Sequence, residues 1–129
     1  MAEMEEDIIM DPAVAWERVE GDLELLRRVI GLFDEYSAGL LVRIRQACAR
    51  RDSQELHQAA HALKGTVGNF GARIAWKAAL RLEKMGHTGT WDQAEETVAE
   101  LEQAVALLKP KLALLPEVLE RQRTENQMT

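Results

Sequence analysis

Between Asp22 and Arg50, apolar side chains recur at steps of three and four residues. The stripe consists of Leu26, Val29, Phe33, Tyr36, Leu40, Ile44 and Ala47. This spacing places them on one face of a long α-helix, and a helix with one apolar face must bury that face against other elements. The stretch therefore constrains the fold more than any other feature, because it calls for partner helices of similar length.

The segments before and after it are also predicted to be helical. Asp11 is an expected N-cap for a short helix, with Pro12 at the first helical position. Asp52 and Glu55 form a capping-box pattern for a helix from about Ser53 to Phe70, which ends in the glycine-rich "GNFGA".

Two more helices are expected in the second half. One runs from Arg73 to Met85 and stops at Gly86; the next is capped by Thr90, with Gln93 completing a box, and continues to about Leu108. Two prolines follow, at 110 and 116, so the chain beyond is either a kinked extension or a short sixth helix, and the polar end is expected to fray.

No segment shows the alternation of a β-strand, and short turns separate the helical segments. We therefore predict an all-α fold, an antiparallel four-helix bundle with a short N-terminal helix and a C-terminal helical extension. The expected division is an acidic lead over residues 1–10, the bundle over residues 11–115 and a polar extension over residues 116–129.

Composition excludes several classes of protein. A chain of 129 residues that is 47% apolar suits one domain with one core. The formal net charge of -6 argues against nucleic acid as the main partner, although a local basic patch stays open. The single cysteine, Cys48, rules out an internal disulfide and a cysteine-based zinc site. The acidic N-terminus is unlike a secretory signal, and no apolar run approaches a membrane span, so we expect a cytoplasmic protein without direct membrane contact.

The helix that starts near Ser53 has two distinct faces. At about 100° per residue, one face collects its large apolar side chains, which are Leu56, Ala59, Leu63, Val67 and Phe70. The opposite face collects His57, His61, Lys64, Gly65 and Gly68. Each exposed glycine inside a helix costs roughly 1 kcal/mol relative to alanine. Either this helix frays early, or side chains are absent there because another molecule must approach His61 closely.

Other chemistries explain this face less well. His57 and His61 have the spacing of a zinc-protease helix, but Gln58 stands where that motif needs a glutamate, and no second motif supplies a third ligand. The segment "GTVGNFG" matches neither kind of phosphate-binding glycine loop, so we do not expect the chain to bind ATP. Cys48 lies on the apolar side of the long helix, which disfavours a cysteine nucleophile.

The stretch "AAHALKGTVGNFGA", Ala59 to Ala72, resembles the signature of histidine-containing phosphotransfer (Hpt) domains of multistep phosphorelays, roughly A-H-x-L-K-G followed by G-A. The similarity extends from about Asp11 to Leu108. The resemblance implies that His61 carries the phosphoryl group, that Lys64 offsets its charge, and that Gly65 and Gly68 give a receiver domain access. His57 has no counterpart in the pattern, and we interpret it as a solvated neighbour.

The resemblance further implies a phosphoryl carrier with no ATP-binding or autokinase activity of its own. It would accept a phosphoryl group from the aspartate of one receiver domain and return it to another, the receivers belonging to response regulators or hybrid histidine kinases. It needs no cofactor of its own, because Mg²⁺ is expected in the partner receiver. We expect a monomer. Whether the chain stands alone or forms the C-terminal part of a hybrid kinase stays open.

Three alternatives remain at this stage. A non-catalytic helical adaptor would bind receivers without carrying phosphate, although such an adaptor has no need to retain His61 and Lys64. A metal-responsive bundle would use His57 together with His61. A basic stripe follows, formed by Arg73, Lys77, Arg81 and Lys84, and we interpret it as a solvated face. The alternative is that Lys77 or Arg81 lies at the rim of a docking surface.

Overall fold

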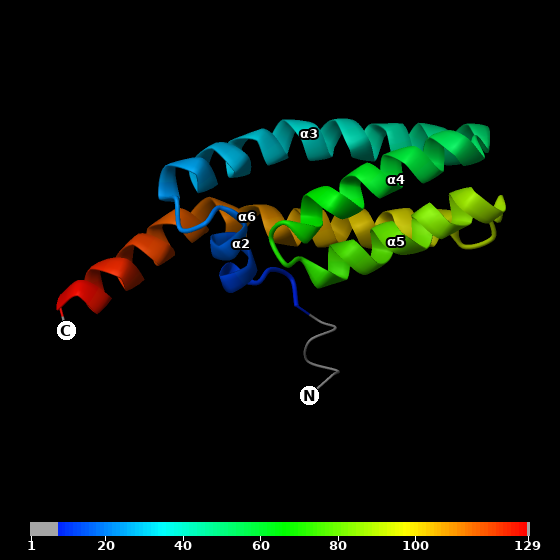
Figure 1. Cartoon of the computed structure of the whole chain (residues 1–129). Coiled ribbons are helices and arrows are strands. Elements are labelled where there is room, and N and C mark those ends of the chain that lie inside the picture. The colour runs from blue at the N-terminus through cyan, green and yellow to red at the C-terminus, as the bar shows by residue number, and fades with distance from the viewer. Residues whose placement is uncertain (1–7, 129) are drawn as a thin grey trace.

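A computed structural model describes residues 8–128, and no strand occurs among them. The helices are α2 (Pro12–Arg18), α3 (Leu23–Arg50), α4 (Ser53–Gly68), α5 (Arg73–Thr88) and α6 (Ala94–Met128). The four long helices pack in sequence, and α6 closes the bundle by returning to α3 (Figure 1). The prediction of a helical bundle with a short N-terminal helix is confirmed. Residues 1–7 of the expected acidic lead lie outside the described residues.

The N-terminal caps at Asp11 and Asp52 are those expected from the sequence, and Asp22 caps α3 in the same way. Asp11, Asp22 and Asp52 each accept a hydrogen bond from a backbone N–H in the first turn of the helix that follows. Glu55 does not complete a capping box, because its carboxylate pairs with Arg43 of α3. This ion pair joins α3 to α4 across their outer surfaces.

The core is built from the faces that the apolar periodicity selects. In α4 it contains the predicted residues Leu56, Ala59, Leu63 and Val67, with Phe70 just beyond the helix. In α3 the prediction was wrong at Tyr36, whose side chain is exposed, while Ser37 is buried and donates a hydrogen bond to the carbonyl of Asp34. Among the buried positions of α3, Phe33, Leu40 and Ala47 recur every seven residues, and Ser37 and Ile44 share their face. The polar Ser37 therefore takes the core position that the apolar pattern assigned to Tyr36.

Two glycines allow other segments to come close to α4 and α5. The expectation that α5 stops at Gly86 was wrong, because the helix continues to Thr88. Gly86 is buried, and a Cβ built there would lie 2.5 Å from the backbone nitrogen of His57, so its absence lets the two backbones touch. Gly71 has a φ of +60° in the turn between the helices, and a Cβ there would lie 2.6 Å from Cβ of Asp11.

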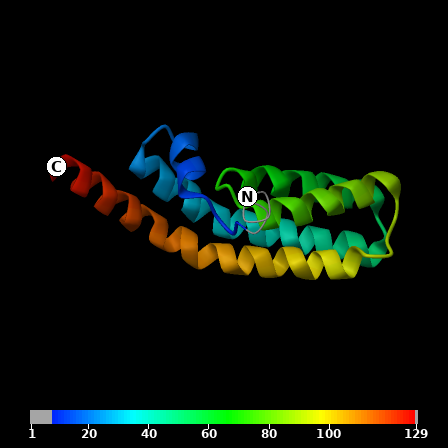
Figure 2. The ribbon, with the colours of Figure 1, turned by 90° about the horizontal axis from the view of Figure 1, so that it is seen from below.

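The last helix differs most from expectation. Thr90 does not cap it, because its hydroxyl pairs with that of Thr88 and the helix starts at Ala94. It then passes through Pro110 and Pro116 without a break, which agrees with the alternative of an extended helix, and it remains helical to Met128 instead of fraying. Leu112, Leu115 and Leu119 are buried in the core, and this burial offsets the two missing backbone hydrogen bonds. Figure 2 shows α6 bending in its C-terminal half.

Candidate functional site

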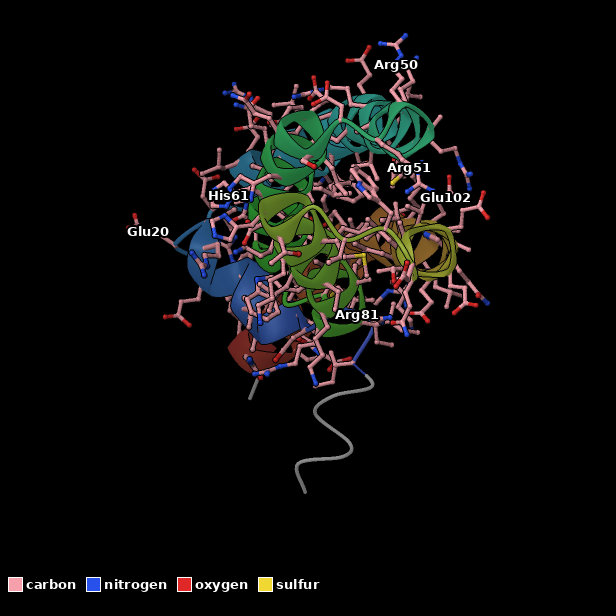
Figure 3. All side chains as sticks on the ribbon, turned by 90° about the vertical axis from the view of Figure 1, so that its right-hand side faces the viewer. Glu20, Arg50, Arg51, His61, Arg81 and Glu102 are labelled. Atoms are coloured by element: carbon pink, nitrogen blue, oxygen red, sulfur yellow. The ribbon has the colours of Figure 1, made fainter. Side chains whose placement is uncertain are left out.

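His61 lies on the outer surface of α4, at the edge of the bundle in the view along its axis (Figure 3). Its side chain is 68% exposed. The helical wheel predicted this exposure, since His61 lies opposite the buried side chains of Leu56 and Leu63. An imidazole in this position is accessible to a second protein.

Glu83 of α5 holds the imidazole from one side. Nδ1 of His61 lies 2.5 Å from Oε2 of Glu83, and the other carboxylate oxygen accepts a hydrogen bond of 2.9 Å from Nζ of Lys64. An ionised carboxylate only accepts hydrogen bonds, so Nδ1 of His61 carries the proton and Nε2 keeps its lone pair. The contact therefore leaves the neutral imidazole with its nucleophilic nitrogen turned away from Glu83.

The charges in this cluster support an ionised Glu83. Burial by itself would raise the pKa of Glu83, but the hydrogen bonds from Lys64 and from His61 outweigh it, and the pKa lies below its usual value. The Glu83 side chain is 13% exposed and that of Lys64 is 20% exposed, so this ion pair is well shielded from water. Lys64 thus neutralises a carboxylate that would otherwise repel any anionic group approaching His61.

The two glycines of the predicted access surface have different surroundings. A Cβ at Gly65 would have nothing within 4 Å, so the surface one turn beyond His61 is open. Gly68 lies against Trp76 of α5, whose Cδ1 is 3.5 Å from the position of a Cβ at Gly68. The ring of Trp76 also lies 5.9 Å from Nζ of Lys64. Gly65 therefore faces open space, whereas Gly68 makes room for an indole of the same chain.

An apolar groove lies just past Gly65, between α3 and the end of α4. It has a volume of about 550 Å³ and is lined by Val29, Leu32, Phe33, Glu35, Tyr36, Thr66, Asn69 and Phe70. Leu32 and Tyr36 are 66% and 53% exposed, and they belong to an outer stripe of α3 that also includes Leu25, whereas Val29 on the same side is half-buried. A contiguous exposed apolar patch of this kind is typical of a protein-binding surface.

The remaining histidines lie next to the site. His57 is half-buried, and its Nδ1 is 3.2 Å from the backbone carbonyl oxygen of Glu83. Its ring is stacked at 6.4 Å from that of His61 and lies 5.8 Å from the ring of His87. Among residues 8–128, no group of three or more His, Cys, Asp or Glu side chains has the arrangement that would hold a metal ion.

The basic stripe of α5 does not act as one surface. Arg81 turns away from His61 toward α6 (Figure 3), where it donates hydrogen bonds to Glu100 and to the hydroxyl of Thr97. Arg81 therefore joins α5 to α6, and the alternative that places it at the rim of a docking surface around His61 does not agree with this geometry.

Sequence reasoning missed Glu83. Its segment lies within the stretch that resembles the family, but nothing in α5 alone indicates which side chain meets His61. The missing information is the register between α4 and α5, which Gly86 and His57 set through backbone contact.

Comparison with known protein families gives a match to the Hpt domain over residues 16–123. Because this match covers most of the chain, the protein belongs to the Hpt domain family, whose members act in histidine phosphotransfer and generally interact with receiver domains. Searches of curated proteins and of solved structures gave no match. In the part of the chain that the structure describes, no helix is long and apolar enough to span a bilayer.

Proposed function

We propose that this protein accepts a phosphoryl group on Nε2 of His61 from the aspartate of a receiver domain and passes it to the aspartate of another. The observation that carries the proposal is the contact between Nδ1 of His61 and Glu83, on a side chain that is 68% exposed. It fixes one nitrogen of the ring and leaves the other one, with its lone pair, on the accessible side.

The chemistry requires little from this chain. The Nε2 lone pair forms a bond to phosphorus while the bond between phosphorus and the aspartate oxygen breaks, and the carboxylate leaves with the electron pair. No proton has to be removed, because the Nδ1 proton stays between His61 and Glu83. The phosphohistidine then returns the group to a second receiver by the reverse step. Mg²⁺ held by the receiver would offset the phosphoryl charge, as phosphoryl transfer generally requires.

The apolar groove and the open surface at Gly65 are the proposed contact area for the receiver. Thr66 and Asn69 continue the exposed side of α4 from Gly65 into the groove, so one partner can cover both. A receiver that brings its phosphorylated aspartate to His61 then buries Leu32 and Tyr36 with its adjoining surface. Gly65 provides the clearance that the reacting groups need.

Incubation with a panel of phosphorylated receivers tests this proposal. We expect rapid appearance of acid-labile phosphate on the protein, at the expense of at least one receiver, and no label on His61→Gln. Calorimetric measurement of binding to the same receivers distinguishes a phosphocarrier from an adaptor that only binds them. Tight binding of a receiver without any transfer of label would favour the adaptor and contradict the phosphocarrier.

A further inference from the structure

His57 has no place in the family pattern, yet it has defined contacts at the site. It lies one turn before His61 on α4, at the point where Gly86 brings the α5 backbone into contact with α4. The rings of the two histidines are separated by 6.4 Å and inclined by only 15°. His57 is therefore fixed beside the nucleophile and is not a freely solvated side chain.

The hydrogen bonds define where protons lie on both rings. The carbonyl oxygen of Glu83 only accepts, so Nδ1 of His57 carries a hydrogen and donates it. His61 likewise directs its Nδ1 to the carboxylate of Glu83. Nε2 lies nearly opposite Nδ1 across an imidazole ring, and both Nδ1 atoms face Glu83, so both Nε2 atoms point away from Glu83. A second proton on His57 can therefore reside only on Nε2, on the side where a phosphoryl group on His61 would lie.

The charge balance leaves a role for such a proton. The ammonium group of Lys64 is already paired with Glu83. A phosphoryl group on His61 adds between one and two negative charges. The titratable groups around His57 are His61 on α4, and Glu83 and His87 on α5. Of these, Glu83 is neutralised by Lys64, which leaves His57, whose ring is stacked on that of His61, as the group that can offset the incoming charge, whereas the His87 ring contacts that of His57.

We propose that His57 is a phosphoryl-binding residue of this site, whose protonated Nε2 stabilises the phosphorylated form of His61. This inference rests on the proposed function. Histidine is the side chain whose charge ordinarily changes between pH 5 and pH 8. We take the 6.4 Å between the two ring centroids as the separation of the charges. In a water-like dielectric, one positive charge on His57 then shifts the equilibrium between phosphorylated and free His61 about threefold for each phosphoryl charge. The phosphorylated form is therefore favoured about three- to tenfold by protonation of His57.

The equilibrium ratio of phosphorylated protein to phosphorylated receiver, measured at pH 6.0 and at pH 8.0, tests the inference. His57→Gln retains an N–H donor for Glu83 but cannot take up a proton, and we expect its ratio to fall three- to tenfold at pH 6.0 only. His57→Lys carries a fixed charge and is expected to keep the high ratio at both pH values. The control His87→Gln removes the ring on the other side of His57 and should match the unmodified protein.

Three results would overturn the inference: an unchanged ratio for His57→Gln at pH 6.0, an equal fall at both pH values, or the same fall in the His87→Gln control. Labelling by phosphoramidate separates this inference from the proposed function, since it needs no receiver. We expect phosphohistidine on the unmodified protein to survive at least threefold longer at pH 6.0 than on His57→Gln. Equal lifetimes, or no label on His61, would contradict the role of His57. If no receiver transfers phosphate to the protein but the phosphohistidine lifetimes differ clearly, the result contradicts only the relay function.

Discussion

Two glycines inside helices, Gly65 and Gly86, should respond in opposite ways to the same substitution. A Cβ at Gly65 meets nothing within 4 Å, so Gly65→Ala gains the helix propensity of alanine without a clash. We expect an increase of up to about 1 kcal/mol in the free energy of unfolding. For a domain of this size that corresponds to a rise of about 3–6 °C in Tm.

At Gly86 the added methyl group would lie 2.5 Å from the backbone nitrogen of His57 and 2.8 Å from the carbonyl oxygen of Ser53. Both atoms belong to the α4 backbone, so the clash is relieved only by moving the two helices apart. An overpacking cost of about 1–3 kcal/mol outweighs the gain in propensity, and Gly86→Ala should lower Tm. Thermal unfolding followed by circular dichroism measures both effects.

The bulkier Gly65→Gln extends the test from stability to docking. The variant should fold, because the position faces solvent, but its side chain would occupy the surface that a receiver must approach. We expect transfer from receivers to collapse while labelling by phosphoramidate continues. If Gly65→Gln accepts phosphate from its receiver at the original rate, or if Gly65→Ala destabilises the protein as Gly86→Ala does, the reasoning from open space is wrong.

Two further predictions concern the imidazole and its partner. His61→Gln should abolish labelling by receivers and change Tm by less than about 2 °C, because the side chain is 68% exposed; a large loss of stability would show that the residue is structural. Glu83 has a lowered pKa in the folded protein, so its contribution to stability is present at neutral pH and is lost as the pH falls below the ordinary carboxyl value of 4.5. Glu83→Gln should therefore weaken the pH dependence of the free energy of unfolding in this range, and it should slow phosphoryl transfer to His61. An unchanged acid transition would contradict the ion pair with Lys64.

The sequence allowed prediction of those features that depend on one helix at a time. The buried face of α4, the exposure of His61 and the caps at Asp11 and Asp52 all follow from spacing and local hydrogen bonding. Glu83 was missed because its role depends on the register between two helices, which no periodicity within α5 reports. Gly86 was misread for the same reason, since it permits a close contact and does not end the helix.

The long α6 helix shows the other limit of local reasoning. Pro110 and Pro116 are poor residues for a helix interior, and local propensity does not decide between a kinked extension and a short sixth helix. Packing in the bundle favours a continuous helix, because Leu112, Leu115 and Leu119 bury their side chains only if the helix continues past Pro110. Tertiary packing also decides which of Tyr36 and Ser37 is buried in α3, where the wheel places both near the edge of the core face.

Binding of a receiver through the apolar groove predicts that Leu32→Ala and Tyr36→Ala weaken the complex without harming the fold. Both side chains are more than half exposed, so each truncation should leave Tm nearly unchanged. If a receiver buries them, each loss should cost about 1–2 kcal/mol of binding, a five- to thirtyfold rise in Kd by calorimetry. Leu114→Ala is the matched control, since Leu114 is 59% exposed but lies on α6 and does not line the groove. Labelling by phosphoramidate should be the same in all three variants, because none of them contacts His61. An equal loss of affinity in Leu114→Ala would mean that the receiver covers another face, and unchanged affinity in all three would separate the groove from phosphotransfer altogether.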